Sequence, residues 1–243
     1  MSVDLRHVQA EFLLPHELRA ALASRPLVYI PLGSLEFHSA HLPIGLDGLT
    51  AHGVCLRAAA KGGGIVCPPL YYGTGGGHTD YPWTIMMEDS AEITALINRS
   101  LQRLEEFGLE TAVLFSGHFA PEQLAMIEDI ARAWRSKESS MRVLALAVNM
   151  LDKSPVEPDH AGVFETSLLS TLWADRVHLE ALPPLAEAPS LDPGNDVRGP
   201  HRHDPSHPLH GVFGPDPRVF DPAKAHHLLD ALVAWLIEKA NTS

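Results

Sequence analysis

Short apolar runs alternate along this chain with longer segments in which apolar residues recur at helical spacing. Four runs are continuous enough to be buried strands, namely residues 27–32, 65–70, 111–115 and 141–148. Six segments carry the helical pattern, namely residues 13–24, 48–61, 89–107, 121–137, 164–175 and 222–240. Strands that alternate with helices are typical of a parallel sheet covered by helices. The pattern therefore predicts an α/β fold whose mainly parallel sheet is flanked by helices on both faces.

Glycine and proline interrupt this pattern in two places. Residues 71–89 are too rich in Gly and Pro for regular structure, and residues 182–222 hold many of the 20 prolines. Because no linker separates the earlier elements, we expect residues 1–243 to form a single α/β domain that carries residues 182–222 as a long Pro-rich surface segment. The histidines of this segment are expected to be exposed loop residues or subunit contacts: His201, His203, His207 and His210.

Charge and composition narrow the class of protein. The 243 residues carry a formal net charge of -12, which argues against binding nucleic acid or an anionic membrane, since both require basic patches. The chain shows no apolar run of membrane-spanning length and no signal-peptide pattern at its start. Cys55 and Cys67 form no CxxC pair and are compatible with a reducing compartment. We therefore expect a cytoplasmic protein whose partner is a small-molecule substrate.

Side chains that can bind a metal follow two of the predicted strands. Glu36 and His38 come just after the first strand and point the same way in extended chain, and Asp47 follows them. His118 comes just after the third strand. Because chemistry in α/β sheets lies at the carboxyl ends of strands, these groups predict a divalent metal site, and N/O ligands suit Zn, Mn or Fe(II). Asp47 alone has a second interpretation, as the N-cap of the helix that it precedes.

Five stretches of the chain resemble, in order and spacing, the motifs of the creatininase (creatinine amidohydrolase) family. PLGSLEFHSAHLPIGLDGLTA is similar to the family's Gly-Ser/Ala-x-Glu-x-His-Gly-x-His-Leu-Pro signature and the Asp that follows it. GHTDYPWTI, SGHFAPEQ and HAGVFETS are similar to its Gly-His-x-x-x-Pro-Gly-Thr, Asn-Gly-His-Gly-Gly-Asn and His-Ala-Gly-x-x-Glu-Thr-Ser segments. GVFGPDPRVFDPAKAHHLLDAL is similar to its closing segment and last helix. The resemblance extends from about residue 12 to residue 240 and implies a creatininase-like fold.

The resemblance implies a ligand set for two divalent metal ions in each chain. Glu36 and His118 would hold one ion. His38 would hold the other, and Asp47 would bridge the two. The position of a further ligand in creatininase is an alanine here, so the acidic candidate for completing the second site is Glu165. The resemblance also implies a homo-oligomer, often a hexamer.

Further residues have implied roles around these metals. His160 matches the histidine that acts as proton shuttle in the family, and Asp159 before it is a candidate for orienting its ring. His78 is either a substrate contact or a support behind the ligands, and Trp83 and Phe119 are either pocket walls or core. Trp83 and Phe119 replace glycines of the family motifs. These bulkier neighbours argue against creatinine itself as the substrate.

Three functions are compatible with these residues. The first is a dinuclear metal-dependent hydrolase that opens a cyclic amide, or cleaves another non-peptide C–N bond, by attack of a metal-bound hydroxide on a carbonyl. The second is a hydrolase that breaks a C–C bond to open the ring of a cyclic keto-polyol of the inosose type. The third is an inactive relative that binds a ligand or serves as a scaffold, against which the intact metal ligands argue.

Overall fold

A four-stranded parallel sheet forms the centre of the computed structural model, which describes residues 5–77, 81–137, 139–189 and 200–242. In spatial order its strands are β2 (Ile65–Val66), β1 (Leu27–Leu32), β5 (Thr111–Ser116) and β6 (Arg142–Ala147). All three strand pairs are parallel, which confirms the prediction from the apolar runs. Leu32 at the end of β1 pairs with Ser116 at the end of β5, so the carboxyl ends of the two central strands lie side by side.

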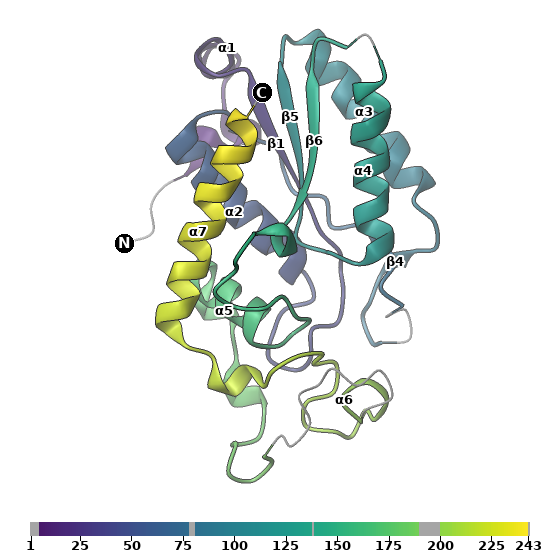
Figure 1. Cartoon of the computed structure of the whole chain (residues 1–243), viewed down its shortest axis with the longest axis vertical. Coiled ribbons are helices and arrows are strands. Elements are labelled where there is room, and N and C mark those ends of the chain that lie inside the picture. The colour runs from purple at the N-terminus through teal and green to yellow at the C-terminus, as the bar shows by residue number, and fades with distance from the viewer. Residues whose placement is uncertain (1–4, 78–80, 138, 190–199, 243) are drawn as a thin grey trace.

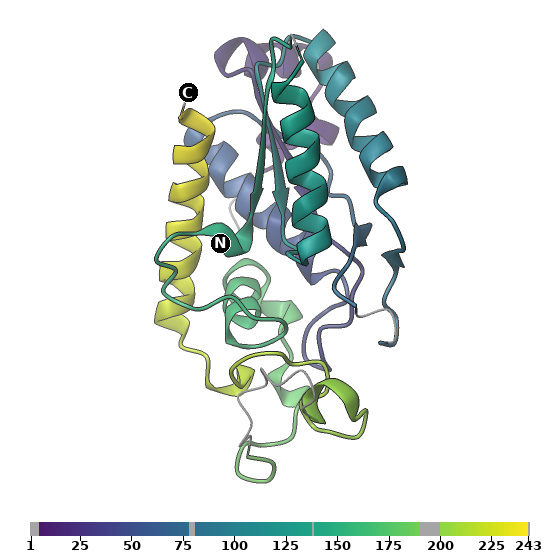
Figure 2. The same cartoon turned by 45° about the vertical axis from the view of Figure 1, so that its right-hand side comes forward.

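Helices cover both faces of this sheet (Figures 1 and 2). The α-helices are α1 (Pro15–Ser24), α2 (Leu46–Gly62), α3 (Ala91–Glu106), α4 (Pro121–Arg135), α5 (Val163–Leu172), α6 (Pro200–His203) and α7 (Pro222–Asn241). One face packs against α2, α5 and α7, and the other against α3 and α4. None of the described helices is long and apolar enough to cross a membrane.

Burial on both faces explains why the central strands are continuously apolar. All six residues of β1 are buried. Tyr29 packs in the apolar cluster with α2 and α7, whereas Val28 and Ile30 pack in the cluster with α3 and α4. A strand with cover on one face only would alternate apolar and polar residues. The run LVYIPL is therefore typical of a central strand in a parallel sheet whose two faces are both covered by helices.

The segment that follows α2 differs from its prediction in two ways, namely the length of one strand and the presence of a further strand pair. Strand β2 covers only Ile65–Val66 of the predicted 65–70, because Pro68 and the proline after it have no N–H to donate to a neighbouring strand. The Gly-rich stretch after it also contains a small parallel pair, β3 (Gly73–Thr74) with β4 (Met86–Met87). The described 3-10 helices are Arg6–Val8, Ala10–Phe12, Val148–Met150, Ala174–Arg176, Leu179–Ala181 and Pro217–Val219.

The Pro-rich segment is partly core, which corrects its prediction as a surface segment. Three of its residues are buried in a third apolar cluster, namely Leu182, Leu209 and Val212. His201 is 2% exposed, so the expectation of an exposed loop histidine is wrong for this position. Leu182, Leu209 and Val212 come to one cluster from separate stretches of the chain, which no periodic pattern indicates. Figure 1 places α6 at the opposite end of the molecule from α1.

Candidate metal centre

Asp47 lies where the ends of β1 and β5 meet the start of α2. A Cβ atom at Gly33 would lie 2.2 Å from the backbone nitrogen of Gly48, and one at Gly117 would lie 2.0 Å from the carbonyl oxygen of Asp47. Only residues without a side chain allow the helix to approach both strand ends this closely. Helix α2 begins at residue 46 and its N-cap is Gly45, so the alternative role of Asp47 as the N-cap is wrong. Its carboxylate instead faces the histidines that follow the strands.

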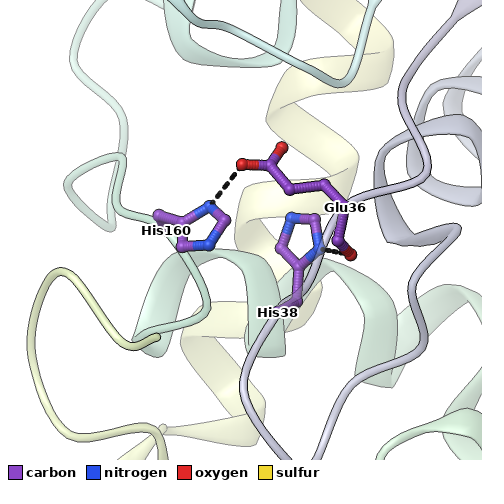
Figure 3. A group of neighbouring side chains, drawn as sticks. All are labelled: Glu36, His38 and His160. Carbon is purple, nitrogen blue, oxygen red and sulfur yellow. Dashed lines mark hydrogen bonds and ion pairs between the residues drawn. The ribbon is translucent and has the colours of Figure 1, made fainter. Parts of the chain in front are cut away.

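Five buried side chains form two of the three groups of possible metal-ligand atoms among the described residues, and the third group joins Glu36 and His38 with His160 (Figure 3). One set consists of Glu36, Asp47 and His118, and the other of His38, Asp47 and Glu165. Within each set the ligand atoms lie within 4.8 Å of one another, and all five side chains are at most 5% exposed. Asp47 belongs to both sets. The geometry therefore gathers the five residues that the resemblance implied as ligands, with Asp47 in the shared position.

Backbone carbonyl groups determine which nitrogen of each histidine faces the carboxylates. Nδ1 of His38 lies 2.9 Å from the carbonyl oxygen of Glu36. Nε2 of His118 lies 3.2 Å from the carbonyl oxygen of Thr74. A carbonyl oxygen only accepts hydrogen bonds, so these nitrogens carry protons and donate. The opposite nitrogens face acids, with His38 Nε2 at 3.3 Å from Asp47 and His118 Nδ1 at 3.0 Å from Glu36. Metal-binding histidines are oriented in this way by their remote N–H.

Protons and divalent cations compete for this group of side chains. Burial lowers the pKa of His38, but the surrounding carboxylates, Glu165 first, outweigh it and raise the pKa to about 10. Burial likewise opposes protonation of His118, but hydrogen bonds to Asp47 and Glu36 raise its pKa to about 10. Burial raises the pKa of Glu165 well above its usual range. Because ligands bind metals in deprotonated form, a bound cation would displace these protons.

Two buried residues beside the ligands hold them in place. The hydroxyl of Ser34 is hydrogen-bonded to the carboxylate of Asp47 and lies 3.2 Å from that of Glu36. Nε2 of His41 lies 3.0 Å from the hydroxyl of Thr166, which ties the ligand loop to α5. Ser34 is not among the site residues predicted from the sequence, although its place directly after the glycine that follows β1 is a usable signal.

Asp159 and Glu165 are connected through the backbone at the start of α5. The carboxylate of Asp159 accepts hydrogen bonds from the N–H groups of Gly162 at 3.1 Å and Phe164 at 2.9 Å, which would otherwise have no partner in the first turn. Burial raises the pKa of Asp159 to about 7. Glu165 accepts from the N–H of Ala161 at 2.6 Å, and Ala161 has a φ of +54°, which L-residues rarely adopt. Such backbone persists only where its surroundings enforce it.

His160 lies directly beside the ligand sets. Figure 3 shows its ring facing the carboxylate of Glu36, with Nδ1 at 3.9 Å from Oε1. Its Nε2 lies 3.1 Å from the carbonyl oxygen of Phe37. The ring stacks on that of His38 at a centroid distance of 4.5 Å and on that of Phe213 at 5.1 Å. The predicted proton shuttle is therefore held by both a hydrogen bond and two ring contacts.

The ligand sets border a cavity of about 260 Å³. Phe119, predicted as either wall or core, lines this cavity together with His160. Arg202 and Phe213 also line it, although both belong to the segment predicted to lie on the surface. Trp83 is 78% exposed and is not among the residues that line the cavity. The third substrate candidate, His78, lies outside the described residues.

The family model described as Creatininase: Creatinine amidohydrolase matches residues 13–240, which is nearly the whole chain. The chain belongs to the creatininase family. This membership makes the chain a metal-dependent hydrolase and agrees with the ligand sets and with the motifs that resemble those of the family.

Individual relatives and structures agree with this assignment. The creatinine amidohydrolase of Pseudomonas putida is 29% identical over 204 residues, which are 75% of this chain and 76% of that protein. The 3-dehydro-scyllo-inosose hydrolase of Thermotoga maritima is 29% identical over 103 residues, or 42% of this chain and 33% of that protein. A crystal structure of creatininase superposes with a TM-score of 0.76 at 24% identity, covering 97% of this chain and 99% of the other, which confirms the fold. Creatininase structures described as Zn-Zn and Mn forms have TM-scores of 0.77 and 0.76.

Proposed function

We propose that this chain is a dinuclear metal hydrolase that cleaves the C–N bond of a small amide, either within a ring or in another non-peptide amide. The observation that carries the proposal is the pair of ligand sets that share Asp47. Glu36 and His118 would hold one ion with Asp47. His38 and Glu165 would hold the other with the same carboxylate. A carboxylate common to two sites is a feature of dinuclear hydrolytic centres.

The chemistry of the donors fits Zn, Mn or Fe(II). Nε2 of His38 is buried and makes no hydrogen bond with any described residue, so it is available to a cation. Three carboxylates, Glu36, Asp47 and Glu165, are buried together, an arrangement that is unfavourable unless positive charge compensates it. The Zn-Zn and Mn forms among the related structures support the same metals. Bound ions of this kind polarise a substrate carbonyl and lower the pKa of water toward neutrality.

We assign proton transfer in this reaction to His160. Amide hydrolysis requires a proton on the leaving nitrogen, because an unprotonated amide anion is a poor leaving group. Nδ1 of His160 faces the carboxylate of Glu36, which places an exchangeable nitrogen beside the ligands. Phe119 and Phe213 supply apolar walls to the cavity that limit the access of water. His160 would thus deliver the proton to the leaving group inside a recess that these two rings partly enclose.

The size of the cavity favours a small substrate. Ligand pockets generally run from about 300 to 1,000 Å³, and this one is about 260 Å³. Phe119 further narrows the cavity where family members carry glycine, which argues against creatinine itself as the substrate. The alternative of a ring-opening C–C hydrolase is supported by the likeness to an inosose hydrolase. An inactive binding or scaffold protein is disfavoured, because all five residues implied as ligands are present and lie close together.

Metal analysis and a substrate panel test this proposal. We expect about two divalent ions per chain in protein purified with metal present, measured by plasma mass spectrometry. The loaded protein would then be assayed against creatinine, N-formyl amides, small lactams and inososes, with the same protein after chelation as the control. Turnover of an amide by the loaded protein supports the proposal. Turnover of inososes alone would establish the C–C hydrolase, and less than one ion per chain would favour the inactive relative.

We also propose that the chain assembles into a homo-oligomer, possibly the hexamer that the family resemblance implies. Two features support association. Large apolar side chains remain exposed on the surface of the chain, among them Phe12, which is 57% exposed, and Trp83, which is 78% exposed. A cleft of about 930 Å³ between α2, α5 and α7 is bordered by Leu56, Leu172 and Trp173, and none of the predicted ligands lines it. Light scattering at micromolar concentration is expected to give a multiple of the 26.4 kDa chain mass, and a monomer mass would contradict this.

A further inference from the structure

Arg202 is a charged residue of the cavity that the roles assigned so far do not use. It lies in α6 and lines the same cavity as the ligands Glu36 and Glu165. Its guanidinium carbon lies 3.8 Å from the centroid of the Phe213 ring. The backbone at this position is fixed as well, because the hydroxyl of Tyr81 donates a hydrogen bond of 2.6 Å to the carbonyl oxygen of Arg202. The positive charge is therefore held at the cavity wall from two directions.

The guanidinium group of Arg202 has no anionic partner among the described residues. Its Nε is buried and makes no hydrogen bond. Arg218 of the same Pro-rich segment shows the usual alternative, because its guanidinium is paired with Asp216 at 2.7 Å and with the carbonyl oxygens of Pro183 and Ala188. A buried donor without a partner costs free energy that a bound acceptor recovers. The unpaired donor of Arg202 therefore marks a place for an anion that the described part of the chain does not supply.

The stacking contacts define which side of the substrate this anion would occupy. The ring of His160 contacts the ligand His38 and also Phe213, and Phe213 in turn carries the guanidinium of Arg202. His160 is the group assigned to protonate the leaving nitrogen. In this series of contacts, Arg202 lies on the far side of the proton donor from the ligand His38. An anion bound to Arg202 would therefore belong to the leaving group rather than to the acyl group.

We propose that Arg202 binds a carboxylate on the amine portion of the substrate, so that the enzyme hydrolyses small N-acyl amino acids or lactams with a carboxylate beside the ring nitrogen. This inference rests on the proposed amide hydrolysis. Water adds across the C–N bond, so the acyl carbon gains an oxygen and the amino acid leaves with the proton. A guanidinium group that lies over an aromatic ring can still offer its N–H donors to the two oxygens of a carboxylate. A phosphate dianion is less suitable, because Glu36, Asp47 and Glu165 line the same cavity.

Binding of an uncleavable probe tests the carboxylate site without requiring turnover. The probes are N-(methylsulfonyl)glycine, which has a carboxylate and no amide C–N bond to cleave, and its neutral amide, N-(methylsulfonyl)glycinamide. Calorimetric titration into metal-loaded protein is expected to show at least a 10-fold preference for the carboxylate. Arg202→Met retains the apolar stem and should reduce this preference about 10–100-fold, since hydrogen bonds to charged groups are worth this much. Arg202→Lys keeps the charge without the planar fork and should retain part of the preference.

Matched controls separate this site from direct binding to the metals. Arg19→Met removes the same charge from an exposed position on α1, at the far end of the molecule, and should keep the full preference. Equal binding of the two probes to the wild-type protein would overturn the proposal. A preference that survives Arg202→Met would also overturn it, because the carboxylate would then be bound by the metals. If Arg202→Met fails to fold, the lysine variant carries the same comparison.

A turnover comparison separates failure of this inference from failure of the proposed function. N-acetylglycine and N-acetylethanolamine share the scissile amide and differ in the carboxylate. The inference requires that kcat/KM be higher for N-acetylglycine than for N-acetylethanolamine. It also requires that this preference for N-acetylglycine fall in Arg202→Met. Equal turnover of both compounds would leave amide hydrolysis standing and refute the carboxylate site. Carboxylate binding through Arg202 without hydrolysis of either amide would support the anion site and count against the proposed reaction.

Discussion

Nε2 of His160 donates a hydrogen bond of 3.1 Å to the carbonyl oxygen of Phe37, the residue between the ligands Glu36 and His38. Because a carbonyl only accepts, this bond places the proton of the neutral ring on Nε2 and leaves Nδ1 as the nitrogen that gains and loses a proton. Nδ1 is also the atom that faces Glu36. The loop that supplies two of the proposed metal ligands thus also sets the tautomer of the proposed proton carrier.

His160→Gln tests this role directly. The variant is expected to lose about 10²–10⁴-fold in kcat, the usual contribution of a general acid or base, because glutamine keeps a donor for Phe37 but cannot carry a proton. Both metals should remain bound, measured by plasma mass spectrometry on the same preparation. Loss of metal would make His160 a ligand, and unchanged kcat would transfer the proton donor to water or to His78.

Asp47→Ala is expected to remove both metals at once, since both ligand sets use this carboxylate. The fold should remain, because the side chain of Asp47 does not cap α2. Metal content and far-ultraviolet circular dichroism measure the two effects. Asp129→Ala, at a position 66% exposed on α4, is the matched control and should keep its metals. An Asp47→Ala protein with two metals and full activity would contradict the bridging assignment.

Glu165→Gln is expected to weaken one metal site and leave the other. Glu165 belongs only to the set with His38 and Asp47, whereas Glu36 and His118 belong to the other. A chelator titration monitored by metal release should therefore change from two comparable affinities to one strong and one weak. If the stoichiometry and both affinities stay the same, the second ion takes its further ligand from water or from another acid.

Stability should depend on pH through His41. Burial, with the nearby charge of His38, lowers the pKa of His41 to about 3, well below its value of 6.5 in an unfolded chain. The unfolded state therefore binds this proton first, and the free energy of unfolding falls as the pH drops from about 6.5 toward 3, by up to about 1.4 kcal/mol per pH unit. His41→Gln should flatten this part of the profile, measured by urea unfolding at pH 7 and pH 5 under equal metal conditions. The exposed His227→Gln should leave the slope as in the wild type, and a slope unaltered by His41→Gln would refute the assignment.

Continuous burial made the central strands and their polar ends predictable. The runs at residues 27–32 and 112–115 are apolar throughout because both faces of the sheet are covered. Parallel strands end at one edge, so Glu36 and His118 could be expected to meet without knowledge of the loops. Glu165 could be named only through the family resemblance. Its position depends on the irregular turn at Ala161, which no periodic pattern indicates.

Tertiary contacts determine the features of the site that could not be predicted from the sequence. Arg202 and Phe213 lie in a Pro-rich segment without period, and only packing between distant segments brings them to the cavity. Asp47 has the residue type of an N-cap, but the close approach of the helix to two strand ends fixes the helix start before it. Trp83 replaces a glycine of the family motif and was therefore a candidate wall, yet its backbone has a φ of +63° and its side chain is exposed.

The two glycines that directly follow β1 and β5 offer a diagnostic for reading related sequences. Gly33 and Gly117 donate nothing to a metal, but a side chain at either would push against the backbone at Asp47. A homologue could thus keep every ligand position and still be unable to assemble the centre, if larger residues replaced these two. If homologues were classified by their ligand residues alone, such a protein would be counted as active. The residue after each central strand would reveal that it cannot form the centre.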